Sequence, residues 1–266
     1  MGVDRFVIER GVLTEYEGAG GDVIIPEGVK KIDEDAFSGC KSLKSVSIPE
    51  GVKKIGFGAF YGCGSLKTIS IPESVAEIGE AAFIDCSGLK SFSVAAGNAR
   101  YSVTSDGRCL LEEGTLHSYF PHVDGGGESC EIPASVTAIG GYAFRDCSSL
   151  KSVTISEGVK KIGFGAFYGC RSLKTISIPE GVSEIGERAF DGCKSLKSVT
   201  IPESVTEIGM RAFDGCSSLK SVAIPGSVTE IGFGAFRSCL SLRSVTIPEG
   251  VREIGEEAFF GCSSLR

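Results

Sequence analysis

A unit of 23 residues recurs nine times along this chain of 266 residues. The units share the pattern I-P-x-x-V-x-x-I-G-x-x-A-F-x-x-C-x-S-L-x-S-V-x, with small departures. They begin at Ile25, Ile48, Ile71, Ile132, Ile155, Ile178, Ile201, Ile224 and Ile247. One unit is too short to bury its own apolar side chains, whereas stacked units bury them against their counterparts in the next coil. The repetition therefore predicts a solenoid.

Each unit contains one predicted strand. In the segment L-x-x-V-x-I, the Val and the Ile lie two residues apart and point to one side, whereas the Ser or Thr between them faces the other way. The strand ends at Pro-Glu-Gly or Pro-Glu-Ser, because Pro removes a ladder donor and Gly relaxes the backbone. The segment A-F-x-x-C is then expected to form a short helical or irregular turn before the next strand.

The repeated Phe and Cys are predicted to be core residues. Nine aligned phenylalanines are expected to form a continuous spine: Phe37, Phe60, Phe83, Phe144, Phe167, Phe190, Phe213, Phe236 and Phe259. Burying one such side chain contributes about 1.5–3 kcal/mol. The repeat cysteines are Cys40, Cys63, Cys86, Cys147, Cys170, Cys193, Cys216, Cys239 and Cys262, and the chain has no C-x-x-C pair. Because stacking spreads these thiols along an axis, we interpret them as small buried hydrophobes rather than zinc ligands.

The pattern L-x-x-V-x-I-P-x-x-V-x-x-I-G-x-x-A-F-x-x-C resembles the BspA-type, or Treponema pallidum-type, leucine-rich repeat, and the resemblance covers nearly the whole chain. It implies a leucine-rich repeat solenoid of the α/β type that is mostly β, a curved right-handed coil with a parallel β-sheet on its concave face. It also implies a bacterial or protozoan cell-surface protein, extracellular in location and implicated in adhesion. One departure concerns Gly51, Ser74, Gly181 and Ser204, which stand where many leucine-rich repeats carry a ladder Asn. Other groups must therefore stabilise these turns.

The non-repeating residues divide the chain into four segments. These are an N-terminal cap (1–24), repeats one to three (25–93), an insertion (94–131) and repeats four to nine (132–266). The cap is predicted to be a β-hairpin with its turn at Arg10-Gly11, and Asp106-Gly107 and Glu113-Gly114 predict hairpin turns in the insertion. We expect one continuous solenoid domain. The chain stops inside the ninth repeat without a polar cap, which favours a fragment truncated at the C-terminus over end-to-end association through the open edge.

The insertion holds both histidines, His117 and His122, and the two cysteines outside the repeats, Cys109 and Cys130. A metal site or a Cys109–Cys130 disulfide is conceivable here. The interpretation that we favour is that all four are ordinary residues of a packed hairpin. The Gly-rich run 123–129 is expected to be a mobile loop.

The sequence argues against several classes of function. It has no G-x-S-x-G, H-E-x-x-H or P-loop motif, so we expect no enzyme, no cofactor and no metal site. The net charge of −7 disfavours a nucleic-acid partner. No run of 18 apolar residues indicates a transmembrane segment, and the first residues do not resemble a signal peptide.

Binding is the function that the exposed strand positions favour. These positions stack into two columns of Ser and Thr beside a column of Lys, since neighbouring strands lie about 4.8 Å apart. The predicted binding residues on the concave face are Lys151, Ser152, Thr154, Lys174, Thr175, Ser177, Lys197, Ser198, Thr200, Lys220 and Ser221. A hydroxyl floor with a cationic rim suits a protein or glycan ligand on a host surface or in extracellular matrix.

Two alternatives to this binding face stay open. Small Ser and Thr allow inward curvature and the charges keep the edges soluble, so the chain could instead be a structural spacer that displays a further domain. On the outer face, four carboxylates stack in later repeats, where they could recruit a divalent cation: Glu184, Glu207, Glu230 and Glu253.

Overall fold

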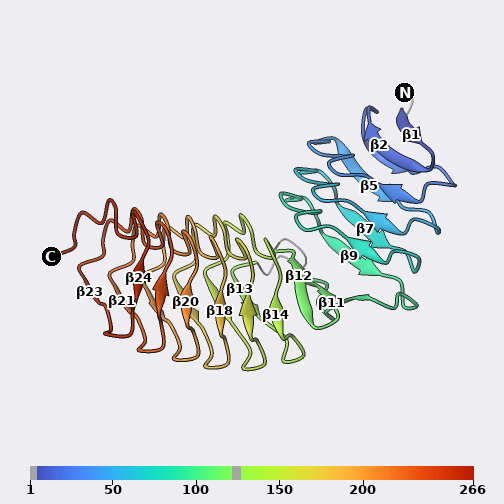
Figure 1. Ribbon diagram of the computed structural model, residues 1–266. Helices are drawn as coiled ribbons and strands as arrows, with labels where there is room; N and C mark the ends of the chain where they lie inside the picture. The colour runs from blue at the N-terminus through green and yellow to red at the C-terminus, as the bar shows by residue number, and fades with distance from the viewer. Residues whose placement is uncertain (1–4, 122–126) are drawn as a thin grey trace. The chain divides into compact units, whose positions relative to one another are not determined.

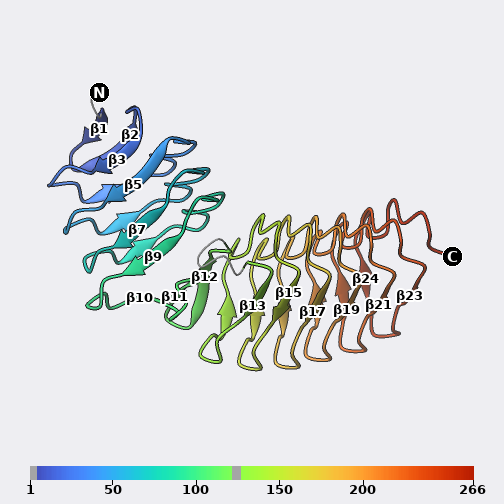
Figure 2. The same cartoon turned by 180° about the vertical axis from the view of Figure 1, so that it is seen from behind.

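The computed structural model describes residues 5–121 and 127–266, which form two compact units. The first unit comprises residues 5–113 and 117–121, and the second comprises residues 114–116 and 127–266. Each unit is a stack of coils, with one coil for each repeat (Figures 1 and 2). The described residues contain no helix, and accordingly none that is long and apolar enough to cross a membrane.

The strands are short and follow the repeats. The first unit contains β1 (Phe6–Glu9), β2 (Val12–Tyr16), β3 (Gly21–Ile24), β4 (Lys31–Ile32), β5 (Leu43–Ser47), β6 (Lys54–Ile55), β7 (Thr68–Ile71), β8 (Glu77–Ile78), β9 (Ser91–Val94), β10 (Tyr101–Val103) and β11 (Cys109–Glu112). Strand β12 (Thr115–Tyr119) begins in the second unit and ends in the first. The second unit continues with β13 (Ser129–Glu131), β14 (Ala138–Ile139), β15 (Ser152–Thr154), β16 (Lys161–Ile162), β17 (Thr175–Ser177), β18 (Glu184–Ile185), β19 (Ser198–Thr200), β20 (Glu207–Ile208), β21 (Ser221–Ala223), β22 (Glu230–Ile231), β23 (Ser244–Thr246) and β24 (Glu253–Ile254).

Repeats one to eight each contribute two strands, which belong to two different parallel sheets, and the ninth contributes β24. The longer strands pair in the order β3-β5-β7-β9 in the first unit and β13-β15-β17-β19-β21-β23 in the second. This is the parallel sheet that the sequence predicts. The two-residue strands form the second ladder, β4-β6-β8, which β2 extends, and β14-β16-β18-β20-β22-β24. Sequence analysis missed this ladder because a strand of two residues shows no alternation of apolar and polar positions.

The A-F-x-x-C segment forms the irregular turn rather than the helix. In the sixth repeat, Arg188 and Gly192 take left-handed φ values of 55° and 74°, which interrupt a right-handed helix. The amide of Phe190 donates to the carbonyl oxygen of Ala212 in the next coil at 2.7 Å, where a helix would bond within the segment. The turn therefore joins neighbouring coils through the backbone.

The predicted hairpins are confirmed. Strands β1 and β2 pair antiparallel through the Arg10-Gly11 turn, where both residues have a positive φ (50° and 81°). Strand β2 then pairs in parallel with β4, so the hairpin covers the first coil and extends its sheet. In the insertion, β10 and β11 pair antiparallel, and the Glu113-Gly114 turn, which joins β11 to its neighbour β12, again has two positive φ values (45° and 85°). These left-handed pairs are typical of tight hairpin turns.

Phenylalanine rings stack along the core of each unit, but the predicted spine is not continuous. In the second unit, Phe190 is fully buried, and its ring centroid lies 5.2 Å from that of Phe167 and 5.1 Å from that of Phe213. In the first unit the stack ends at Phe83, whose ring meets Phe120 of the insertion at 72°. The expectation of one uninterrupted column is wrong at this point, because the insertion supplies an edge-on ring in place of a parallel one.

The repeat cysteines lie in the core and have a polar role that the sequence did not reveal. Seven thiols each donate to the carbonyl oxygen of the Phe in the preceding coil at 3.0–3.3 Å: Cys63, Cys86, Cys170, Cys193, Cys216, Cys239 and Cys262. A thiol combines apolar packing with a weak donor, so it fills the core and also adds a hydrogen bond to a buried carbonyl group.

Thiol titration tests this account of the cysteines. The denatured, unreduced protein is expected to show at least nine reactive thiols with a disulfide reagent such as DTNB. The native protein should react slowly at the buried positions, because burial raises the pKa of Cys63 to about 12 and that of Cys170 further above its ordinary range. Half-buried Cys40 and Cys262 should react first. A count near one thiol after denaturation would contradict the buried ladder.

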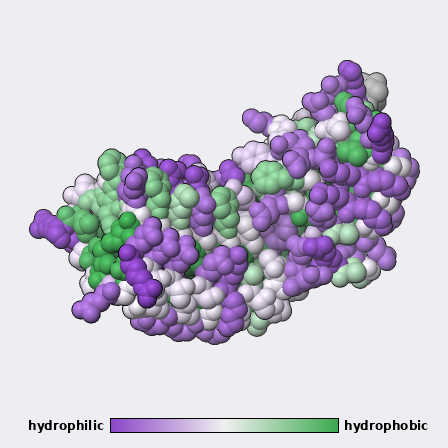
Figure 3. All heavy atoms as spheres, viewed as in Figure 1, coloured by the Kyte–Doolittle hydropathy of each residue, from purple (hydrophilic) through white to green (hydrophobic). Residues whose placement is uncertain are grey.

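Within a run of repeats, each coil is covered by the coil that follows it. Ile231 is fully buried, whereas the equivalent Ile254 in the last coil is 47% exposed. The same holds for Ile224, which is 7% exposed, and its equivalent Ile247, which is 40% exposed. Figure 3 shows the resulting apolar side chains gathered at the C-terminal end. The core of one repeat is thus completed only by its neighbour.

The turns that lack a ladder Asn are held by serine. The hydroxyl of Ser74 accepts a hydrogen bond from the amide of Gly51 at 2.9 Å and donates to the carbonyl oxygen of Val52 at 2.8 Å. Ser204 likewise donates to the carbonyl oxygen of Val182 in the preceding coil. Serine therefore supplies the inter-coil contact for which the sequence offered no obvious group.

Candidate functional site

The predicted Ser and Thr residues of the second unit lie on one face of one sheet. Strands β15, β17, β19 and β21 pair in register, so one row joins Ser152, Thr175, Ser198 and Ser221. A second row joins Thr154, Ser177, Thr200 and Ala223. Ser152 is half-buried and the other side chains of the two rows are exposed. The row between them, which includes Val153 and Val199, faces the core. We call the two exposed rows the hydroxyl columns.

The lysines continue this ladder just before each strand, in what we call the lysine column: Lys151, Lys174, Lys197, Lys220 and Arg243. The amide of Lys174 donates to the carbonyl oxygen of Lys151 at 2.9 Å, and that of Lys197 donates to Lys174 at 3.2 Å. The amide of Lys220 donates to the carbonyl oxygen of Lys197 at 3.1 Å. Backbone pairing therefore brings all eleven predicted residues together along neighbouring coils.

The lysine column is largely without counter-charges. Lys151 forms an ion pair with Glu128, with Nζ and Oε1 2.6 Å apart. Lys174, Lys197 and Lys220 have no such partner among the residues that the structure describes, and all three are exposed. Each ammonium group thus keeps donors for a ligand, and the neighbouring hydroxyl groups can both donate and accept hydrogen bonds.

In the first unit, a groove lies over the corresponding sheet. It has a volume of about 440 Å³ and is lined at its floor by five hydroxyl groups, those of Ser47, Thr68, Ser70, Ser91 and Ser93. Strands β5, β7 and β9 carry these residues in register. The sequence placed them in the exposed columns but gave no sign of a groove, because its depth depends on the loops that follow the strands.

The glutamate column on the second ladder is in register as well. Glu207 pairs with Glu230 and Glu230 with Glu253 across β20, β22 and β24. Glu184 forms an ion pair with Lys161, with Oε1 and Nζ 2.9 Å apart. Within residues 5–121 and 127–266, no three His, Cys, Asp or Glu side chains converge as metal ligands would. The column is therefore a solvated row of carboxylates, and the charge of Glu184 at one end is neutralised by Lys161.

Two aspartates of the turn face have raised pKa values, which the sequence did not indicate. Burial and the neighbouring Asp214 raise the pKa of Asp191 to about 6, and burial also raises the pKa of Asp214. Arg188 and Arg211 oppose the shift at Asp191. Arg211 also lies over the ring of Phe233, with its Cζ 5.6 Å from the centroid. Burial beside a like charge accounts for the raised pKa of Asp191 without a ligand.

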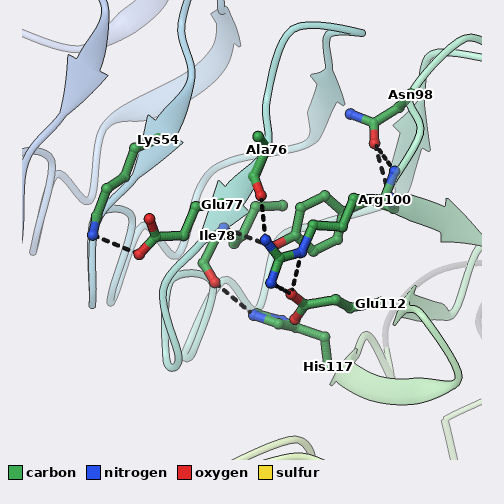
Figure 4. A network of polar contacts seen from close by, with 9 residues as sticks. Lys54, Ala76, Glu77, Ile78, Asn98, Arg100, Glu112 and His117 are labelled. Atoms are coloured by element: carbon green, nitrogen blue, oxygen red, sulfur yellow. Dashed lines mark hydrogen bonds and ion pairs between the residues drawn. The ribbon is translucent and has the colours of Figure 1, made fainter.

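The insertion covers the free edge of the third coil with polar side chains (Figure 4). The imidazole Nε2 of His117 lies 3.0 Å from the carbonyl oxygen of Ile78, and the amide of Ile78 donates to the hydroxyl oxygen of Tyr101 at 2.8 Å. Arg100 donates to the carbonyl oxygen of Ala76 and also pairs with Glu112. These side chains satisfy the edge of β8, which a further coil would otherwise pair.

The predictions for the insertion can now be placed. His117 is a packed residue of the first unit, as the favoured interpretation has it, and His122 lies outside the described residues. Cys109 is buried in β11 and Cys130 in β13. Sequence reasoning missed the contact of His117 with the edge of β8. No sequence pattern indicates that a side chain will occupy the place of a neighbouring strand.

The burial of His117 makes the first unit sensitive to acid. Burial holds the pKa of His117 below its ordinary value of 6.5, although Glu112 and Glu80 pull it upward. The unfolded chain therefore binds a proton at a higher pH than the folded chain does, so the free energy of unfolding falls as the pH drops below about 6.5.

We expect the stability difference between the wild type and His117→Gln to change between pH 7.5 and pH 5, with the wild type losing more. Glutamine keeps an amide donor for Ile78 but does not titrate. Urea unfolding of both proteins across this range measures the difference. Parallel pH profiles would contradict a role for His117.

Comparison with known proteins identifies the family. A sequence model of the family described as BspA type Leucine rich repeat region matches residues 19–121 and 126–232, in six copies. The chain belongs to this family. Comparison with curated proteins gave no match.

Solved structures of leucine-rich repeat proteins are similar to this chain. A leucine rich cell surface protein of Faecalibacterium prausnitzii is 34% identical with a TM-score of 0.73, over 88% of this chain and 59% of its own length. This chain thus spans less than two thirds of that protein. A leucine-rich repeat protein of Bacteroides ovatus is 25% identical with a TM-score of 0.52, over 99% of this chain and 91% of its own. The pneumococcal vaccine antigen PcpA, 23% identical over 88% of this chain and 73% of its own with a TM-score of 0.66, shares the fold.

Proposed function

We propose that this chain is a non-enzymatic binding module of a bacterial cell-surface protein, which adheres to host or other cells through the sheet face of its second unit. The observation that carries the proposal is the row of exposed, unpaired ammonium groups beside the hydroxyl columns, held in register by backbone pairing. A ligand laid on this face meets the same donors on every strand. The ligand class that suits it is a protein or glycan of a host surface or extracellular matrix.

Two further points support this proposal. A family relative of 34% identity is described as a cell surface protein, which favours the same location here. The sheet face is also rigid, because the Val and Ile residues between the exposed columns are buried against the next coil. A rigid face loses little conformational entropy when a ligand binds.

Blocking the face tests the proposal. The double variant Thr175→Trp and Ser198→Trp places bulky rings on the exposed hydroxyl columns, where β-strands tolerate aromatic residues. An array of glycans and extracellular-matrix proteins, probed with the purified chain, is expected to show binding that this variant loses at least tenfold.

The matched control is the double variant Glu184→Trp and Glu207→Trp, which places the same rings on exposed positions of the second ladder. It should bind like the wild type. Equal loss in both variants would overturn the assignment to this face. An array without any binding would favour the alternative, a spacer that displays another domain.

A further inference from the structure

Three members of the lysine column form no ion pair with described residues, whereas several other cations of the second unit do. Arg145, Arg188, Arg211 and Arg237 on the turn face, and Lys161 on the second ladder, each lie within 4.0 Å of a carboxylate oxygen. Lys174, Lys197 and Lys220 form no such pair with described residues. In a chain with a net charge of −7, this row concentrates positive charge along one line of the second unit.

Neighbouring cations reinforce this column. Arg171 and Lys194 are exposed and lie three residues before Lys174 and Lys197, respectively. Three residues span at most about 11 Å of chain, close to one Debye length at physiological ionic strength. Their charges therefore add to the potential at the column, which attracts anions.

We infer that the lysine column of the second unit binds a linear polysaccharide with one anionic group per sugar, laid across the strands along the axis of the coil stack. This inference rests on the proposed function, because it requires the sheet face to be the binding surface. Each ammonium group pairs with one anionic group of the polymer. The hydroxyl columns, with Thr175, Ser198 and Ser221 nearest to the lysines, hydrogen-bond to the sugar hydroxyls.

The spacing of the column favours a polysaccharide over an acidic peptide. Paired parallel strands place consecutive lysines about 4.8 Å apart. A polymer of pyranose rings advances by about one such spacing per sugar, so its charge per unit length matches that of the column. An extended peptide presents side chains on one face only about every 6.7 Å, so its charges fall out of step within a few strands.

The hydroxyl columns also argue against nucleic acid as the polyanion. Single strands are usually held by aromatic side chains on which the bases stack, in addition to basic groups. The positions beside the lysine column hold Ser, Thr and one Ala, Ala223, but no aromatic residue. A sugar polymer needs no stacking partner to use hydroxyl groups and ammonium groups together.

The experiment measures binding of polygalacturonate, which carries one carboxylate per sugar, to the full chain by calorimetry or biolayer interferometry. Its methyl ester, which has the same backbone without the charge, and poly-glutamate serve as ligand controls. We expect polygalacturonate to bind, the ester not to bind and poly-glutamate to bind at least tenfold more weakly. Affinity for polygalacturonate should fall steeply as salt is raised, because counterions are released on binding.

Charge reversal then locates the site. The triple variant Lys174→Glu, Lys197→Glu and Lys220→Glu should lose about ten- to a hundredfold in affinity, since an exposed ion pair contributes little by itself but three act together. The matched control is Lys30→Glu, Lys53→Glu and Lys160→Glu, which reverses three exposed lysines away from the column. It should keep the wild-type affinity. The single variant Lys197→Ala, which barely perturbs folding, should lose about two- to fivefold.

The outcomes separate this inference from the proposed function. Equal losses in both triple variants would overturn the column as the site. Poly-glutamate binding as tightly as polygalacturonate would overturn the polysaccharide in favour of an acidic peptide. No polygalacturonate binding, together with array binding that Thr175→Trp and Ser198→Trp abolish, would overturn this inference and leave the proposed function standing.

Discussion

Phe190→Ala is expected to lower the free energy of unfolding of the second unit by about 3–5 kcal/mol. The ring of Phe190 is fully buried between those of Phe167 and Phe213, so its removal leaves a cavity in the middle of the stack. The backbone cannot collapse into this cavity, because the amide of Phe190 is bonded to Ala212 of the next coil at 2.7 Å. The lost free energy of unfolding therefore has two parts, the free energy of transferring the ring from water to the core and the cost of the cavity that remains. Urea unfolding followed by circular dichroism measures it.

Phe259→Ala is the matched control in the same column. The ring of Phe259 has a stacking partner on one side, Phe236 at 5.5 Å, and its side chain is only partly buried. The same substitution there should cost less than half as much. If the two variants were equally destabilised, the rings would not contribute through stacking between coils, and the spine would lose its place as a main source of stability.

Most of the fold could be predicted from the sequence, because the same spacing of apolar residues recurs in nine repeats. Stacking, the long-strand sheet and the buried Phe and Cys follow from the spacing of apolar residues alone. What the sequence left open depends on contacts between coils. The second ladder needs only two residues per coil, and the thiol of Cys193 finds the carbonyl oxygen of Phe167 at 3.2 Å only after stacking.

For the candidate site, too, the sequence predicts the positions of residues but not the contacts between them. The sequence placed Thr175, Ser177 and Ser198 on one exposed face, since alternation decides which way a strand residue points. It could not show which charges are neutralised. Lys151 pairs with Glu128 of the insertion, which lies outside the repeat pattern, whereas the next lysines of the column have no described partner. Counter-charges from outside the repeat are thus visible only in three dimensions.

The insertion marks the limit of repeat-based reasoning. Hairpin turns such as Glu113-Gly114 have a local signature and were predicted. The docking of His117 and Tyr101 on the edge of β8 has none, because it joins residues far apart in sequence through single side-chain hydrogen bonds. The same docking ends the parallel ring stack at Phe83. A segment that occurs once gives no pattern from which such contacts could be inferred.

Gly209→Ala is expected to lower the free energy of unfolding by about 1–3 kcal/mol, although alanine usually favours the folded chain over glycine. A Cβ at this position would lie 2.8 Å from the backbone N of Glu187 and 2.9 Å from the carbonyl oxygen of Ile185 in the preceding coil. Backbone atoms cannot turn aside as a side chain can. The coils would have to move apart, which weakens the ladder between β18 and β20. This close approach explains why glycine follows the second Ile in the repeat.

Gly226→Ala supplies the opposite expectation in the same unit. Gly226 is exposed and does not have a positive φ. A Cβ at this position would have no other atom within 4 Å. Alanine should therefore raise the free energy of unfolding by up to about 1 kcal/mol, because it restricts the unfolded chain. Urea unfolding of both variants measures the two shifts under one condition. Shifts of the same sign would mean that chain entropy, and not the approach of neighbouring coils, decides where this solenoid requires glycine.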